Sequence, residues 1–102
     1  MLKVGEKEYD LKYNLKRVES IENATGTPLM SALISSKGMM SLSQLKNCFC
    51  YGLKEPGSDS FMPLSAGQAV FEQALNEYGY AGLVSEVVET LQRDCPFFFL
   101  AD

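Results

Sequence analysis

Three cysteines are the residues of this chain that could bind a metal ion or carry out redox chemistry. Cys48 and Cys50 stand two positions apart in the segment CFC, and Cys95 follows much later. Residues at that spacing on a helix point to nearly opposite sides, and zinc requires four ligands in a chain that contains no histidine. We therefore predict no metal site, and we interpret the three cysteines as small apolar residues of the core.

Paired carboxylates offer a second kind of chemistry, general acid and base catalysis. Glu19 and Glu22, and likewise Glu86 and Glu89, lie on predicted helix faces opposite the apolar residues, where charged side chains are solvated. The chain also lacks histidine, the commonest general base. Its glycines, in MPLSAGQAVF and YGYAG, do not have the order or spacing of a phosphate-binding loop. We predict that the protein is not an enzyme and has no catalytic residue, cofactor or small-molecule substrate.

The composition is that of one ordinary globular domain. The chain has 102 residues, of which 46% are hydrophobic and 22% are charged. With a net charge of -4, the chain has few unpaired basic side chains that could neutralise the phosphates of a nucleic-acid duplex. The apolar runs are far shorter than the roughly 20 residues that span a bilayer, and the N-terminus has no apolar signal segment. We expect a cytosolic protein with reduced thiols and with neither nucleic acid nor membrane as a partner.

The N-terminal residues 1–13 alternate in the manner of a β-hairpin with one apolar face. Tyr9, Leu11 and Tyr13 alternate with charged residues, and Leu2 and Val4 do the same before Gly5. A two-residue loop would pair Leu2 with Tyr9, and a four-residue loop would pair Val4 with Tyr9. Both registers keep the apolar side chains on one face, which must lie on helices or on a neighbouring copy.

The next residues predict two helices with an abrupt corner between them. Asn14 is a suitable N-cap, Leu15, Val18 and Ile21 share one side, and Gly26 supplies a left-handed C-cap. Thr27 and Pro28 then favour the start of a short second helix, PLMSALISS, which ends near Gly38.

Three further helices are predicted in the rest of the chain. Ser41 with Gln44, and Ser65 with Gln68, each have the spacing of a capping box, and the loop KEPGSDS separates the two helices. Gly79 ends the second of them, and a last helix ends before Pro96. We therefore expect a single, mainly α domain, 1–102, of about five helices, with a β-hairpin at 1–13, a helical part at 14–95 and an apolar C-terminal tail at 96–102.

Apolar residues also occur where helix periodicity does not require them. Phe61 and Met62 follow the polar loop and are expected to fold back onto the core. The others either fill the core or contact a partner, and both readings stay open. These candidate partner-binding residues are Met39, Met40, Phe97, Phe98, Phe99 and Leu100.

The segment LKRVESIENATG resembles a helix of the small tail assembly chaperones of long-tailed bacteriophages, prophages and gene transfer agents. The positions that match are Leu15, Lys16, Val18, Glu19, Ile21, Glu22, Ala24, Thr25 and Gly26, and Cys50–Leu53 resembles a later apolar segment that ends in GL. The resemblance covers about the first half of the chain. It implies a non-enzymatic chaperone that binds the tape-measure protein and recruits tail-tube subunits in the host cytoplasm.

A different class of protein competes with this reading. A small cytosolic adaptor or regulatory subunit could use the same apolar terminus to dock on one folded bacterial protein. A chaperone should bind a long polymer in many copies, whereas an adaptor should show one defined stoichiometry. Self-association through the ribbon edge or the phenylalanine-rich tail is a further expectation.

Overall fold

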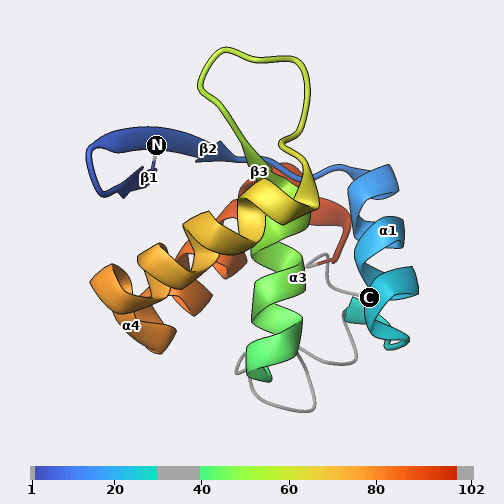
Figure 1. The fold of residues 1–102 in the computed structure, drawn as a ribbon. Helices are drawn as coiled ribbons and strands as arrows, with labels where there is room; N and C mark the ends of the chain where they lie inside the picture. Colours follow the sequence, from blue (N-terminus) through green and yellow to red (C-terminus); the bar gives the residue numbers. More distant parts are fainter. Residues whose placement is uncertain (1, 30–39, 99–102) are drawn as a thin grey trace.

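Figure 1 shows a computed structural model of the chain, which describes residues 2–29 and 40–98. Helix α3 runs through the middle, with α1 on one side, α4 on the other and the strands across one end. The elements in chain order are β1 (Leu2–Val4), β2 (Lys7–Leu11), α1 (Leu15–Thr25), α3 (Leu42–Gly52), β3 (Leu53–Lys54), α4 (Leu64–Asp94) and the 3-10 turn η1 (Pro96–Phe98).

The predicted hairpin is confirmed, with the shorter of the two loops. Leu2 lies opposite Tyr9 and Val4 lies opposite Lys7, so the loop consists of Gly5 and one further residue. Gly5 has a φ of 63°, which glycine adopts without strain. The apolar face of the hairpin is buried, as its alternation predicts.

The expectation of about five helices is wrong, and the hairpin is part of a larger sheet than predicted. The structure is 65% helical, with three α-helices and a three-stranded antiparallel sheet in the described ranges. The helices predicted on either side of Gly79 are both present and together make up α4, whose backbone leaves helical geometry at Gly79 (φ 76°, ψ 168°), the residue predicted to end the first of them. Strand β3, only two residues long, adds to β2 with Leu53 opposite Leu11. The short helix predicted from Pro28 falls mainly on residues 30–39, outside the described residues.

Three of the predicted helix caps are confirmed and one is wrong. The Asn14 side chain accepts a hydrogen bond from the Arg17 N–H, Gly26 is left-handed with a φ of 70°, and Ser41 forms both bonds of a capping box with Gln44. Helix α4, in contrast, begins at Leu64, before the predicted Ser65, and its start has no side-chain cap.

Helix α3 is the centre of the hydrophobic core. It packs against α1 on one side and against α4 on the other, so residues around most of its circumference are buried. The rings of Phe49 and Phe71 are 5.6 Å apart and join α3 to α4. Leu15, predicted to share the apolar side of its helix, is 61% exposed, and Leu42 is 54% exposed. Each is the first residue of its helix.

Within the described parts of the chain, no helix combines the length and the hydrophobicity that crossing a bilayer would require.

Candidate functional site

The six candidate partner-binding residues do not form one described patch. Phe97 lies in η1 and its side chain is 48% exposed, and Phe98 ends the same turn. Met39, Phe99 and Leu100 lie outside the described residues. Phe97 is therefore the candidate whose exposure agrees with a contact surface.

Met40 belongs to the core. Its side chain is 3% exposed, and its sulfur lies 3.7 Å from the Cys48 thiol. The Tyr80 hydroxyl donates a hydrogen bond to the Met40 carbonyl oxygen. Met40 therefore connects the segment before α3 to α4. Of the two interpretations left open for this residue, its burial supports core filling.

Other exposed apolar side chains were missed by the helix periodicity. Besides Leu15 and Leu42, Leu64 is 39% exposed and is also the first residue of its helix. Leu15 and Leu42 directly follow the predicted N-caps Asn14 and Ser41, and this position could have indicated their exposure. Leu64 precedes the predicted helix start at Ser65 and carried no such signal. Met62 packs against the core as expected, and Phe61 lies under the Arg17 guanidinium, 4.1 Å from the ring centroid.

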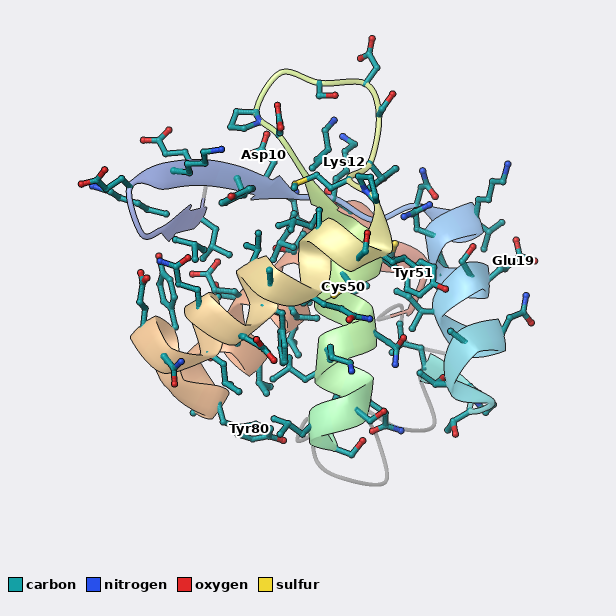
Figure 2. The ribbon with its side chains drawn as sticks, viewed as in Figure 1. Asp10, Lys12, Glu19, Cys50, Tyr51 and Tyr80 are labelled. Atoms are coloured by element: carbon teal, nitrogen blue, oxygen red, sulfur yellow. The ribbon has the colours of Figure 1, made fainter. Side chains whose placement is uncertain are left out.

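The three cysteines are buried as reduced thiols in the core. Burial raises the pKa of Cys48 to about 12 and that of Cys50 to about 11, so neither is a reactive thiolate near neutral pH. Figure 2 shows Cys50 on the central helix, facing the start of α4. In residues 2–29 and 40–98 no group of three potential metal ligands comes together.

This burial predicts slow reaction of the cysteines with alkylating agents. At pH 8 the native protein should react with iodoacetamide at least about 100-fold more slowly than the unfolded chain in urea, because alkylation requires an opened state. Mass spectrometry with time counts the modified thiols. Rapid modification of Cys48 or Cys50 in native protein would contradict this, and an exposed cysteine introduced as Ser43→Cys is the positive control.

The predicted carboxylate pairs do not form a shared acid-base site. Glu19 projects from α1 into solvent (Figure 2), while Glu22 accepts a hydrogen bond from the Leu29 N–H at 2.7 Å. Glu89 is exposed on α4, and Glu86 lines a hollow described next. The two carboxylates of each pair therefore lie in different environments.

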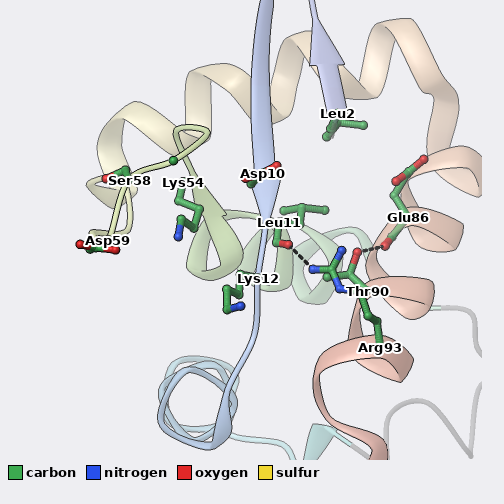
Figure 3. Close-up of a pocket in the computed structure, with 11 residues that line it drawn as sticks. Leu2, Asp10, Leu11, Lys12, Lys54, Ser58, Asp59, Glu86, Thr90 and Arg93 are labelled. Carbon is green, nitrogen blue, oxygen red and sulfur yellow. Dashed lines mark hydrogen bonds between the residues drawn. The ribbon is translucent and has the colours of Figure 1, made fainter.

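A polar hollow of about 360 Å³ lies over β2, between the loop after β3 and the last turns of α4 (Figure 3). On one side of the strand are Lys54 and Asp59, and on the other are Glu86 and Arg93. The charges of the lining are mixed, with three basic and three acidic side chains. In full, the lining consists of Leu2, Asp10, Leu11, Lys12, Lys54, Gly57, Ser58, Asp59, Glu86, Thr90 and Arg93.

Two side chains from the end of α4 hold the strand at this hollow. The Arg93 guanidinium donates to the Leu11 carbonyl oxygen at 2.9 Å, and the Tyr13 N–H donates to the Asp94 carboxylate at 2.9 Å. Arg93 and Asp94 also form an ion pair of 2.8 Å. These contacts join residues about 80 positions apart, so no local pattern in the sequence could predict them.

The outer edges of the sheet are covered by the chain itself. At β1, Tyr78 donates to the Lys3 carbonyl oxygen at 2.6 Å, and the Gly5 N–H donates to the Glu77 carboxylate at 3.0 Å. At β3, Phe61 forms a bridge with Lys54. Strand pairing between copies through the ribbon edge would first have to displace these contacts.

Comparison of the chain with protein-family models, with curated proteins and with solved structures gave no match.

Proposed function

We propose that this protein is a non-enzymatic tail assembly chaperone of a bacteriophage or prophage. It would bind the tape-measure protein in the host cytoplasm and recruit tail-tube subunits. The observation that carries the proposal is the half-exposed Phe97, which lies in the apolar C-terminal sequence 96–102. The resemblance of Leu15–Gly26 to the helix of that family supports this class of partner.

The distribution of charge supports a role in keeping an apolar partner in solution. Helix α4 contains five acidic residues and a single basic one, and acidic residues such as Glu72 and Glu89 lie on its exposed surface. A surface of one sign repels like-charged copies, which opposes aggregation while an apolar patch contacts the partner.

Co-expression tests the proposal directly. The tagged protein would be produced with the tape-measure and tube proteins encoded beside it, purified by the tag, and its complexes measured by light scattering. Many copies on one tape-measure chain are expected. Binding to neither protein, together with a tight one-to-one complex with a different folded protein, would establish the adaptor instead.

Truncating Phe97 should weaken capture of the tape-measure protein. Removing a half-exposed aromatic side chain from an interface costs about 1 to 2 kcal/mol, so Phe97→Ala should lower the affinity roughly ten-fold. Leu15→Ala is the matched control, because Leu15 is still more exposed but lies at the start of α1. Biolayer interferometry on the purified proteins measures both, and an equal loss in the two variants would remove the special role of Phe97.

A further inference from the structure

Helix α4 changes direction at a single residue. Figure 1 shows its first half running outward from α3, away from α1, and its second half turning back. The corner is at Gly79, whose φ of 76° and ψ of 168° lie in a region that is almost restricted to glycine. The chain is helical on both sides of this residue. Gly79 is therefore a one-residue hinge between two helical halves.

The half of α4 before the hinge is bound to the hairpin. The Tyr78 hydroxyl donates to the Lys3 carbonyl oxygen at 2.6 Å, and the Gly5 N–H donates to the Glu77 carboxylate at 3.0 Å. The Phe71 side chain of this half is buried against α3. These contacts hold the first half on its own chain, whatever position the second half takes.

The half of α4 after the hinge makes a separate set of contacts. The Tyr80 hydroxyl donates to the Met40 carbonyl oxygen, and at the far end Asp94 accepts a hydrogen bond from the Tyr13 N–H at 2.9 Å. Met40 and Tyr13 both lie outside α4, so the same surface of a second copy could accept this half. The buried apolar side chains that it would carry across are Leu83, Val84, Val87, Leu91 and Cys95.

We propose that Gly79 is the hinge of a segment exchange between two copies of this chain. Residues 80–98 of each copy leave their own chain and pack on the same surface of the other, while α4 straightens into one helix of 31 residues, about 46 Å long. The contacts of the second half then form between chains, and the straight helix gains the backbone hydrogen bonds that the corner interrupts. Monomer and dimer therefore differ mainly at the hinge, and protein concentration sets their balance. This exchange does not depend on the chaperone function proposed above.

Alanine at position 79 should shift the balance to the dimer. A Cβ atom is strained in the backbone conformation of the corner but not in a continuous helix, where alanine is favoured over glycine. Each dimer contains two hinges, so Gly79→Ala is expected to lower the dissociation constant of the dimer at least about 100-fold. Gly57→Ala is the matched control, because Gly57 has the same φ of 76° and equally open space around it but lies in the loop before α4. This control should stay as monomeric as the original protein.

Size-exclusion chromatography with multi-angle light scattering measures the mass of the three proteins between about 10 µM and about 1 mM. The original protein, refolded from urea at the highest concentration, should contain a dimer that returns to monomer on dilution, so the test does not rest on the folding of a variant. Circular dichroism verifies that each variant is helical. Monomers at every concentration in the original protein and in folded Gly79→Ala would overturn the proposal. An equal gain of dimer in Gly57→Ala would overturn it too.

An isotope-edited NMR experiment separates segment exchange from a side-by-side dimer. Deuterated, 15N-labelled protein is refolded with an equal amount of unlabelled protein, and the dimer is isolated. In the exchanged dimer the Tyr13 amide of the labelled chain lies beside Asp94 of the unlabelled chain, so a nuclear Overhauser effect between them is expected. The Gly5 amide is the internal control, because its acceptor Glu77 stays on the same chain and should give no effect between chains. A dimer without the effect at Tyr13, or with one at Gly5 as well, would overturn the hinge at Gly79.

Discussion

Replacing Gly52 with alanine is expected to lower the free energy of unfolding by about 3 kcal/mol. A Cβ atom at Gly52 would lie 2.6 Å from two ring carbons of Tyr13, closer than carbon atoms approach without bonding. The ring has no room to retreat, since Tyr13 is 1% exposed and its hydroxyl donates to the Cys48 carbonyl oxygen at 2.7 Å. The clash therefore has to move either α3 or the end of the hairpin strand.

Urea unfolding followed by circular dichroism measures this loss, and Gly82→Ala is the matched control. At Gly82 the new Cβ would lie 3.3 Å from the Tyr78 Cβ, a contact that a small shift relieves, and alanine favours helix over glycine. The control should change the unfolding free energy by less than about 1 kcal/mol. Equal stabilities of the two variants would show that Tyr13 can leave its site at little cost.

The features that depend on neighbours in the sequence were predictable. The alternation around Tyr9, the N-cap Asn14 and the left-handed Gly26 each follow from the preferences of a few adjacent residues. The two-residue strand β3 was not, because a segment as short as Leu53–Lys54 carries no periodicity and becomes a strand only by pairing with β2. Position 52 likewise requires glycine only because the ring of Tyr13, which is distant in the sequence, packs against it in the folded protein.

The environments of the candidate functional residues were harder to predict from the sequence than the helices and strands. The core-filling interpretation of the cysteines agreed with their burial, and Met40, for which core filling and partner contact were both open, is in the core. The contacts of Arg93 and Asp94 with the segment around Leu11 had no counterpart in the sequence analysis, since the two look like ordinary charged residues at a helix end. Only their long-range contacts with the strand distinguish them.

Replacing Asp94 with asparagine is expected to lower the free energy of unfolding at neutral pH, and this loss should become smaller in acid. Burial raises the pKa of Asp94, but the hydrogen bonds from Arg93 and the Tyr13 N–H, with the charges of Arg93 and Lys12, outweigh it and hold this pKa below its ordinary value. A carboxyl group whose pKa is lower in the folded state stabilises the protein above the unfolded pKa of about 3.9 and loses that contribution as pH falls through the folded value.

Asp94→Asn should therefore cost about 1.5 kcal/mol at pH 7, the value of charge-assisted hydrogen bonds that become neutral, and the difference from the original protein should shrink as the pH falls through the pKa that Asp94 has in the folded protein. Urea unfolding at a series of pH values measures it. Glu89→Gln, a neutral replacement of an exposed carboxylate five positions earlier on the same helix, should have little effect at any pH. If Asp94→Asn lost the same stability at pH 7 and pH 3, the asparagine geometry rather than the charge would be responsible. A loss confined to neutral pH would instead show that the ionised carboxylate is responsible, through its hydrogen bond with the Tyr13 N–H, which joins the end of α4 to the segment after β2.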